Sequence, residues 1–334
     1  MTPVILKNAA SGAIAHILPE VGFNLYQLQV PVGSRTVEVL DSTVDFAATG
    51  QSPNHNGIPL LFPFPNRIRG ARYNWDGREY VLDGVHQDGQ GNAIHGLVID
   101  RPWRVTEREP AAVTGQFQLS IDAPDRRALW PADFLIEVRY ELHESALRCD
   151  VRVANPDKVP LPFGFGTHSY FKVPLSAGSQ RNDCLIQAPA AEEWELVNCL
   201  PTGKRLPVTG RKDLREGQEL KDLKLDDVLT GLSAAGHSAE ELSAEELSAE
   251  ELGVVTVVMD PSAGLEVRQT FDKAFRELVV YTPPHGRSVC LEPYTCTTDA
   301  IHLAEQGIDG GWRVLAPGAE FRTWFQISAG LVYA

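Results

Sequence analysis

Apolar and polar residues alternate along several stretches of this chain, and this period of two limits its fold more than any other feature. Every second residue is apolar over residues 134–142, and after a turn at residues 144–145 the alternation resumes over residues 147–153. Successive side chains of a β-strand point to opposite faces, so the pattern predicts an antiparallel hairpin with one buried face. The pattern returns over residues 117–121 and 321–327, which we also predict to be strands.

Turn chemistry predicts a further hairpin. Residues 73–82 carry aromatic residues on both sides of Asp76-Gly77, and an Asp-Gly pair supplies the two positive-φ positions of a type I′ turn. With 28 Gly and 23 Pro dividing the chain and no sustained helical periodicity, we expect roughly twenty strands. We therefore predict an all-β fold, a large antiparallel β-sandwich, and treat residues 1–334 as one domain because no linker interrupts the strand pattern.

One segment departs from this pattern. Residues 238–252 are the pentapeptide Ser-Ala-Glu-Glu-Leu three times over. A helix turns about 100° per residue, so leucines spaced by five residues would spiral around it and could not form one apolar stripe. The repeat also carries six of the acidic residues in a chain of net charge −14. We predict a solvated, low-complexity surface insertion without a chemical role.

Charge and cysteine content exclude several classes of protein. A net charge of −14 argues against nucleic acid and anionic membrane as partners, because both need clustered basic residues. The five cysteines are odd in number, widely spaced and without a CxxC motif, which indicates reduced thiols and a cytoplasmic location. Residues 1–22 show no signal-peptide pattern, and no apolar stretch reaches transmembrane length.

Four stretches place polar or ionisable groups beside Gly and Pro. They contain Arg67 after a Pro-rich turn, His95 before a Gly, His168 after alternating Gly and aromatic residues, and Glu292 before a Pro. Taken singly, Arg67 is better explained as a surface residue and His95 as a core histidine, and Glu292 is at least equally well explained as a solvated strand end. His168 favours a functional site more strongly, because its Gly-aromatic surroundings are typical of a pocket rim. We expect Pro293 to end the pairing of its strand and to leave Glu292 near a sheet edge or the mouth of a site.

Known cofactor and nucleophile motifs are absent from the sequence. The nine histidines form no HExxH pattern and no cluster with metal-ligand spacing, so we predict no metal site. There is no GxSxG elbow and no Gly-rich phosphate loop. We therefore expect a protein that needs no cofactor and binds a neutral small molecule.

In this order, the stretches resemble the aldose 1-epimerase (galactose mutarotase) family, and the resemblance covers nearly the whole chain. The residues that carry it are Asn66-Arg67-Ile68, the 70–82 hairpin, His95-Gly96, residues 166–171, Leu225-Asp226-Asp227, Leu291-Glu292-Pro293 and Leu315-Ala316-Pro317-Gly318. The family fold is a large antiparallel β-sandwich with the sugar in an open groove on one sheet. This agrees with the fold predicted from the alternation alone.

The resemblance implies a role for each candidate residue. Glu292 resembles the family's general base and His168 its general acid. Arg67 and His95 resemble groups that hold and orient the sugar. Asp226 resembles the carboxylate that binds sugar hydroxyls, although the neighbouring Asp227 leaves the register open by one residue.

The implied reaction interconverts the α and β anomers of a free aldohexose. It removes a proton from the C1 hydroxyl and delivers one to the ring oxygen, which requires one acceptor and one donor. Ordinary pKa values of about 4.3 for Glu and about 6.5 for His would make Glu292 an ionised base and allow His168 to be protonated at neutral pH. No hydride, phosphate or metal takes part.

The sequence differs from the family pattern at two positions, and three alternative functions remain open. Ser169 replaces the family's common Pro, and Leu97 stands where the best-known galactose mutarotases have Gly, which makes galactose less certain as the substrate. One rival is a hexose-6-phosphate 1-epimerase, for which Arg69 or Arg101 could contact the phosphate. Another is a non-catalytic sugar-binding or sugar-sensing protein. The third is a glycosidase, whose usual catalytic groups are two carboxylates.

Overall fold

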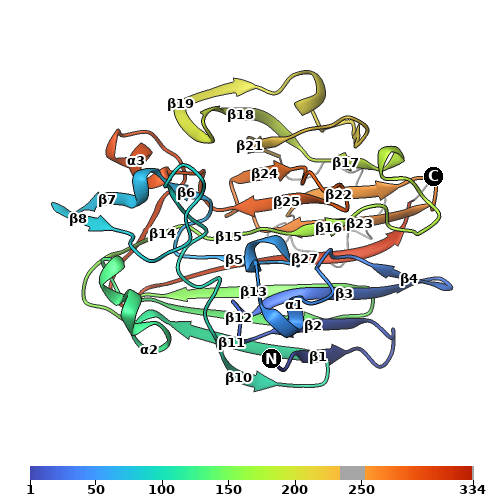
Figure 1. Ribbon diagram of the computed structural model, residues 1–334, viewed down its shortest axis with the longest axis horizontal. Coiled ribbons are helices and arrows are strands. Elements are labelled where there is room, and N and C mark those ends of the chain that lie inside the picture. Colours follow the sequence, from blue (N-terminus) through green and yellow to red (C-terminus); the bar gives the residue numbers. More distant parts are fainter. Residues whose placement is uncertain (234–252, 333–334) are drawn as a thin grey trace, which may run out of the picture.

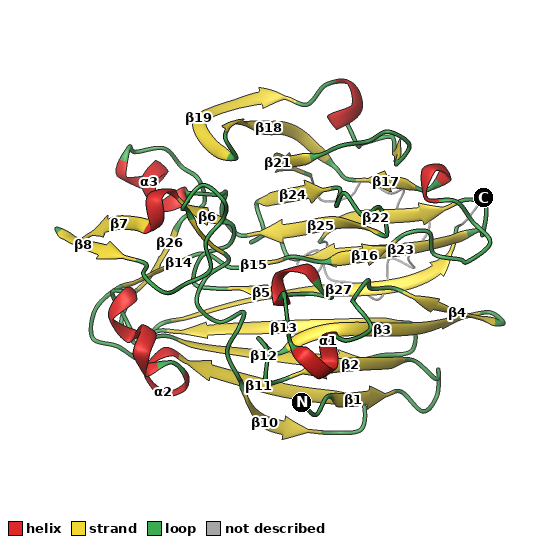
Figure 2. Cartoon of the chain, in the orientation of Figure 1, coloured by secondary structure: helices red, strands yellow, loops and turns green. Residues whose placement is uncertain are grey.

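The computed structural model describes residues 1–233 and 253–332, and it is built mainly from antiparallel strands (Figures 1 and 2). The prediction of an all-β, antiparallel sandwich is confirmed. The pentapeptide repeat at residues 238–252 lies outside the described residues, so its surface position stays a prediction, as does the single domain.

The larger sheet contains the hairpin predicted from the alternation. Val138 pairs with Val151 across this hairpin, in the register that places the apolar residues on one face. In order across the sheet, its strands are β10 (Arg104–Arg108), β11 (Ala112–Gln118), β12 (Leu135–Leu142), β13 (Ala146–Ala154), β27 (Glu320–Leu331), β23 (Leu265–Phe271), β22 (Val254–Asp260), β17 (Leu185–Gln187) and β20 (Gln218–Glu219).

The second large sheet carries the residues of interest. Its strands in order are β19 (Leu200–Pro207), β18 (Ala190–Val197), β21 (Asp226–Leu232), β24 (Glu277–Tyr281), β25 (Ser288–Tyr294), β15 (Gly166–Thr167) and β5 (Leu60–Leu61), and β16 (Tyr170–Lys172) also pairs with β25. The two sheets pack face to face. Their facing side chains, among them Ile136, Val151 and Phe325 from one sheet and Leu278 and Leu291 from the other, belong to one buried cluster.

Smaller elements complete the structure. A four-stranded sheet consists of β1 (Val4–Lys7), β2 (Ile14–Leu18), β3 (Asn24–Val32) and β4 (Arg35–Glu38). Two-stranded ribbons are β14 (Leu161–Phe163) with β26 (Arg313–Leu315), β6 (Arg67–Ile68) with β9 (Ala93–Ile94), and β7 (Arg72–Trp75) with β8 (Arg78–Val81). The α-helices of the described residues are short: α1 (Phe46–Thr49), α2 (Leu119–Asp122) and α3 (Ala300–Glu305). None of them has the length and apolar character needed to cross a membrane.

The β7–β8 hairpin forms as its turn residues predict. Asp76 and Gly77 both have positive φ, at 49° and 73°, as a type I′ turn requires. Tyr73 pairs with Tyr80 across the hairpin, and their rings stack with centroids 5.2 Å apart.

The strand predicted over residues 117–121 is wrong in its second half. Strand β11 ends at Gln118, and α2 begins at Leu119. Asp122 accepts a hydrogen bond from the Gln118 backbone N–H at 2.6 Å, and Asp133 accepts one from the Ser120 backbone N–H at 2.9 Å. Side-chain acceptors of this kind compete with strand pairing for backbone donors. Ile121 is consequently turned to solvent.

All five cysteines are free. Cys149, Cys184, Cys290 and Cys296 are buried, and Cys199 is partly exposed. This agrees with the prediction of reduced thiols. The cytoplasmic location that the thiols suggested stays a prediction.

Candidate functional site

The predicted site residues meet on the outer face of the second large sheet. In β25, Val289 and Leu291 point into the core between the sheets, so the alternate residues Cys290, Glu292 and Tyr294 point away from it. His168 follows β15, where Gly166 pairs with Tyr294. Because the two strands are antiparallel, His168, two residues after Gly166, lies opposite Glu292, two residues before Tyr294.

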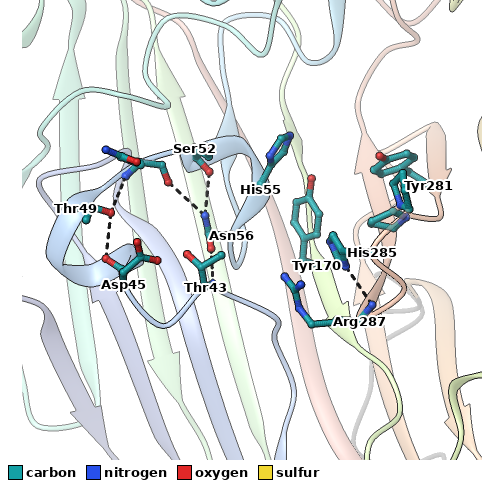
Figure 3. A pocket seen from close by; sticks show the side chains of 13 residues that line it. Thr43, Asp45, Thr49, Ser52, His55, Asn56, Tyr170, Tyr281, His285 and Arg287 are labelled. Atoms are coloured by element: carbon teal, nitrogen blue, oxygen red, sulfur yellow. Dashed lines mark hydrogen bonds between the residues drawn. The ribbon is translucent and has the colours of Figure 1, made fainter.

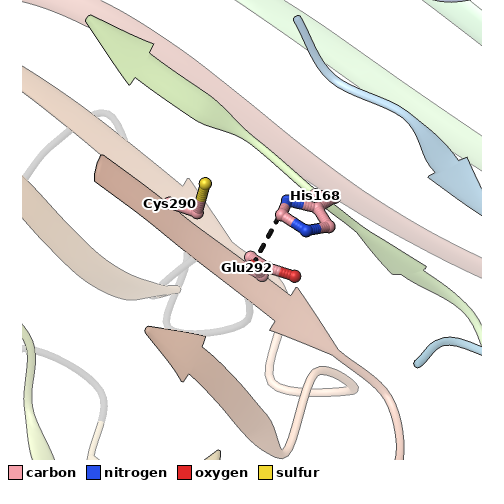
Figure 4. A group of neighbouring side chains, drawn as sticks. All are labelled: His168, Cys290 and Glu292. Carbon is pink, nitrogen blue, oxygen red and sulfur yellow. Dashed lines mark ion pairs between the residues drawn. The ribbon is translucent and has the colours of Figure 1, made fainter. Parts of the chain in front are cut away.

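His168 and Glu292 are in direct contact, although 124 positions separate them in the chain. Nδ1 of His168 lies 3.3 Å from Oε1 of Glu292 (Figure 4). The contact is too long for a hydrogen bond of good geometry, and neither atom has another partner in the described part of the chain. The other carboxylate oxygen, Oε2, accepts a hydrogen bond of 2.5 Å from the Tyr294 hydroxyl. Glu292 is only 1% exposed and His168 only 7%.

The expected sheet-edge position of Glu292 is wrong. Strand β25 is an interior strand and continues through Pro293, which pairs with Leu278 of β24. The other side of β25 has a gap, because β16 pairs with residues 288–290 and β15 pairs only with Tyr294. A proline, which lacks the N–H of the ladder, fits such an irregularity. The contact between His168 and Glu292 forms at this gap.

Burial reverses the protonation states that ordinary pKa values suggest. Loss of solvent raises the pKa of Glu292 well above its usual range, and the nearby negative charge of Asp226 raises it further. The hydrogen bond from Tyr294 and the charge of Arg67 act in the opposite direction. Burial also lowers the pKa of His168 to about 3, with a contribution from His55. Both groups are thus driven toward their neutral forms because a low-dielectric site disfavours either charge.

Arg67 is held in place by acceptors on two sides. Its Nε donates to Asp88 Oδ2 at 2.8 Å, and its Nη1 donates to Asn66 Oδ1 at 2.8 Å. Burial alone would raise the pKa of Asp88, but hydrogen bonds from Asn92 and Arg67 outweigh it and bring the pKa to about 2. Arg67 therefore has a permanently ionised partner, and Nη2 is left without a hydrogen bond to any described residue.

His95 lies beside His168, with the two ring centroids 5.3 Å apart. Its backbone has a positive φ of 68°, and its Nδ1 is buried with no hydrogen-bond partner among the described residues. Burial lowers its pKa well below the usual value, so the ring is neutral. The next residue must be Gly, because a Cβ on Gly96 would lie 2.2 Å from the carbonyl oxygen of Phe62.

The sheet register distinguishes the two neighbouring aspartates. Asp226 pairs with Tyr281, which pairs with Cys290, so Asp226 shares the outer face with Glu292. Asp227 is on the opposite face and forms an ion pair of 2.8 Å with Lys212. Asp226 is therefore the aspartate on the side of the candidate site.

Strand periodicity also marks a residue that was not among the predicted site residues. Tyr294 is two residues after Glu292, so strand periodicity alone places both on one face. Tyr170 was likewise missed, and its ring stacks on His168 with centroids 4.6 Å apart and an interplanar angle of 4°. No comparable sequence signal marks Asp88, which follows no strand and approaches Arg67 only through the turn at residues 88–92.

His168, Cys290 and Glu292 form a potential metal-ligand set (Figure 4). Their ligand atoms lie within 4.8 Å of one another, and the N, S and O donors are types that Zn²⁺ accepts. Burial raises the pKa of the Cys290 thiol well above its usual value, so a metal would first have to displace that proton. A bound metal would also occupy atoms of His168 and Glu292 that the predicted acid–base chemistry requires. The absence of a resident metal stays a prediction.

A cavity of about 380 Å³ is lined by Tyr170, the neighbour of His168 (Figure 3). Tyr170 and Tyr281 form the wall nearest to His168, and residues from the α1 region and from the β24–β25 connection form the other sides. The Tyr281 ring centroid lies 6.3 Å from that of His168. Tyr170 thus both lines the cavity and stacks on His168, whereas His168 and Glu292 are not among the residues that line it.

Comparisons with known proteins agree on one family. A sequence profile of the family described as aldose 1-epimerase matches residues 6–328. The uncharacterized protein YihR of Escherichia coli is 29% identical over 136 residues, which are 40% of this chain and 41% of that protein. The uncharacterized protein YphB of the same organism is 28% identical over 146 residues, 44% of each chain. These alignments thus span less than half of each curated relative.

Solved structures match over nearly the full length. A galactose mutarotase-like protein from Clostridium acetobutylicum has a TM-score of 0.82 at 21% identity, covering 96% of this chain and 93% of that one. The GalM/aldose epimerase homologue from C. elegans has a TM-score of 0.77 at 18% identity, covering 99% and 100%. At these identities the likeness shows the fold.

Proposed function

Because the chain belongs to the aldose 1-epimerase family, we propose that it interconverts the α and β anomers of a free aldohexose by acid–base opening and closing of the ring. The main support is the buried contact between His168 and Glu292. It joins a proton donor and a proton acceptor at one place on the sheet. A protein that only bound sugar would have no need to bury two ionisable groups against each other, since burial without full hydrogen bonding costs free energy.

The proposed mechanism uses one mobile proton of the pair. Transfer of this proton from Glu292 to His168 yields a carboxylate and an imidazolium with no change in net charge. Glu292 then accepts the proton of the C1 hydroxyl while His168 donates its proton to the ring oxygen. The C1–O5 bond breaks as the C1 carbonyl forms, and both protein groups become neutral, the forms that burial favours.

Closure of the ring runs the same transfers in reverse. After rotation about C1–C2, the C5 hydroxyl attacks the other face of the carbonyl carbon, His168 takes its proton, and Glu292 returns a proton to the C1 oxygen. Each well-placed proton transfer contributes about 10²–10⁴ in rate. Protons are conserved over the cycle, so the reaction consumes no co-reactant.

Arg67, His95 and Asp226 are proposed to hold the sugar. Nη2 of Arg67 and Nδ1 of His95 have no hydrogen-bond partner in the described part of the chain and can bond sugar hydroxyls, and the exposed carboxylate of Asp226 can accept from such hydroxyls. The two arginines considered for a phosphate are already paired: Arg69 with Asp299 at 3.2 Å and Arg101 with Asp125 at 2.6 Å. These pairs support a free sugar over a hexose 6-phosphate.

The function is tested by NMR exchange between anomers over a panel of free aldoses, including glucose and galactose, with and without the protein. We expect faster α–β exchange for at least one free aldohexose, and slower or no turnover of glucose 6-phosphate. Sugar binding without faster exchange would instead identify a non-catalytic sugar-binding protein. Cleavage of a glycoside would identify a glycosidase.

Asp226→Asn is expected to raise KM with a smaller effect on kcat. A hydrogen bond to a charged group contributes about 1.5–3 kcal/mol, so kcat/KM should fall by about tenfold or more. Asp227→Asn is the matched control, because it alters the adjacent residue on the opposite face. Equal effects of the two substitutions on KM would contradict the assignment of Asp226.

Tyr294→Phe is expected to shift the pH profile of kcat/KM. The hydrogen bond from Tyr294 lowers the pKa of Glu292, so its removal raises that pKa further. The proposed mechanism starts from a pair that holds one proton on Glu292, so activity falls as pH rises through the pKa of Glu292 and that proton is lost. The basic limb of the profile should therefore move to higher pH in Tyr294→Phe.

The control for this shift is Tyr140→Phe. The Tyr140 hydroxyl is also buried but has no hydrogen-bond partner in the described part of the chain. Its removal should leave the pH profile unchanged. An unshifted basic limb in Tyr294→Phe would show that this tyrosine does not tune Glu292.

A further inference from the structure

The backbone of Arg67 is held by residues that lie about 230 positions further along the chain. The Thr298 hydroxyl accepts a hydrogen bond of 3.3 Å from the Arg67 N–H, and the Arg67 carbonyl accepts one of 2.9 Å from the Asp299 N–H. The Asp299 carboxylate also accepts from the Arg69 N–H at 3.0 Å. Thr298 and Asp299 precede α3, which lies beside β6 (Figure 1). The segment that follows β25 therefore fixes the path of β6.

The same Thr298 hydroxyl is also linked to the side chain of Arg67. It donates at 3.2 Å to Asn66 Oδ1, and this oxygen accepts a second hydrogen bond, of 2.8 Å, from Arg67 Nη1. A guanidinium can only donate, so the Asn66 atom that faces Nη1 must be the oxygen, and the Thr298 hydroxyl must donate to it. The lone pairs of the hydroxyl are then directed to the Arg67 N–H. One hydroxyl thus connects the backbone and the guanidinium of Arg67.

Burial makes this hydroxyl hard to replace by water. Thr298 and Asn66 are both buried, so a lost hydrogen bond between them would leave polar groups without a partner. Asn66 has a positive φ of 55°, a conformation that most residues other than Gly avoid, and its carbonyl accepts from the His95 N–H at 2.9 Å. Without the Thr298 hydroxyl, the Asn66 amide is no longer fixed as the acceptor for Arg67 Nη1.

We propose that Thr298 is a positioning residue that holds the guanidinium of Arg67 in the orientation that binds the sugar. The proposal rests on the proposed function, in which Arg67 bonds a sugar hydroxyl. A guanidinium that is already ordered loses less freedom on binding than a mobile one. The Thr298 hydroxyl bonds residues 66 and 67 and not the pair of Glu292 and His168. Its removal should therefore weaken sugar binding more than proton transfer.

The test is Thr298→Val, which removes the hydroxyl and keeps the shape of the side chain. Anomer exchange of glucose and of galactose is measured by NMR over a range of concentrations. We expect KM to rise by about threefold to tenfold and kcat to change by less than about twofold. Thr298→Ser restores the hydroxyl, so its KM should lie within about twofold of the wild-type value. An unchanged KM in Thr298→Val, whatever its melting temperature, or no recovery in Thr298→Ser would overturn the proposal.

Thr297→Val is the matched control for loss of a buried threonine hydroxyl. Thr297 is as buried as its neighbour Thr298, but its hydroxyl has no hydrogen-bond partner in the described part of the chain. We expect KM and kcat to stay at their wild-type values. An equal rise of KM in Thr297→Val and Thr298→Val would show a general loosening of this segment and would contradict a specific role for Thr298.

Arg67→Met tests whether Thr298 acts through Arg67, because methionine has no guanidinium to hold in place. In the Arg67→Met background we expect Thr298→Val to change KM by less than about twofold, since residues that act through one contact have non-additive effects. A further rise of about threefold to tenfold there would show another route and overturn the proposal. Failure of the wild-type protein to exchange any sugar would overturn the proposed function itself, whereas the outcomes above test Thr298 in an active enzyme.

Discussion

Replacing Glu292 with glutamine is expected to lower kcat for anomer exchange by about 10²–10⁴. Glutamine keeps the shape of the side chain and can still accept the hydrogen bond from the Tyr294 hydroxyl. It cannot take up and return a proton. Glu292 is 1% exposed and contacts His168, so water has little access to the site and cannot readily take over as proton acceptor. The measurement is NMR anomer exchange, with the melting temperature as a check of folding.

Glu277→Gln is the matched control for this substitution. Glu277 is a buried carboxyl on the neighbouring strand β24, and it accepts a hydrogen bond of 3.0 Å from Trp194 Nε1. Burial raises its pKa to about 7, so it resembles Glu292 in its environment but does not contact His168. We expect nearly full activity. Wild-type kcat in Glu292→Gln, or an equal loss in Glu277→Gln, would contradict the role of Glu292 as the base.

His168→Asn is expected to lower kcat by a similar factor, about 10²–10⁴. Asparagine offers polar atoms near the positions of the imidazole nitrogens but cannot donate a proton to the ring oxygen. The double variant Glu292→Gln/His168→Asn should be little worse than either single variant, because residues that act as a unit have non-additive effects. This comparison distinguishes a coupled pair from two independent contributions.

His16→Asn is the control for removal of an imidazole. His16 lies on β2 of the four-stranded sheet, not on the second large sheet, and its Nδ1 is 3.2 Å from the Tyr26 hydroxyl. We expect its loss to leave kcat unchanged. If the losses of the two single variants multiplied in the double variant, His168 and Glu292 would be acting separately and the shared-proton mechanism would fail.

Much of the strand structure could be predicted because it depends on local pattern. Alternation over residues 134–153 determined the β12–β13 hairpin and its register, since a shift by one residue would expose the entire apolar face. Asp76-Gly77 determined a tight turn because few residues tolerate two successive positive φ values. The strand prediction failed at residues 119–121, where Asp122 and Asp133 accept hydrogen bonds from the backbone. Asp133 approaches from across a loop, so no local pattern could show its effect.

The candidate site was only partly predictable. Resemblance to a family identified Arg67, His95, His168, Asp226 and Glu292, and the structure brings His168 into contact with Glu292 and His95 beside His168. The resemblance could not show that β25 is an interior strand, nor that the gap beside Pro293 lets His168 reach Glu292. The choice between Asp226 and Asp227 as the residue facing the site also depended on the pairing of β21 with β24.

Residue types and their local order were determined by the sequence alone: alternating strands, a tight Asp-Gly turn, and a set of groups able to transfer protons. Only the tertiary structure decided the protonation states of Glu292 and His168. An isolated Glu would be ionised at neutral pH, but burial in the sheet raises the pKa of Glu292 and lowers that of His168. The physical reason is that solvent exclusion depends on which distant strands pack together, and no stretch of sequence contains that information by itself.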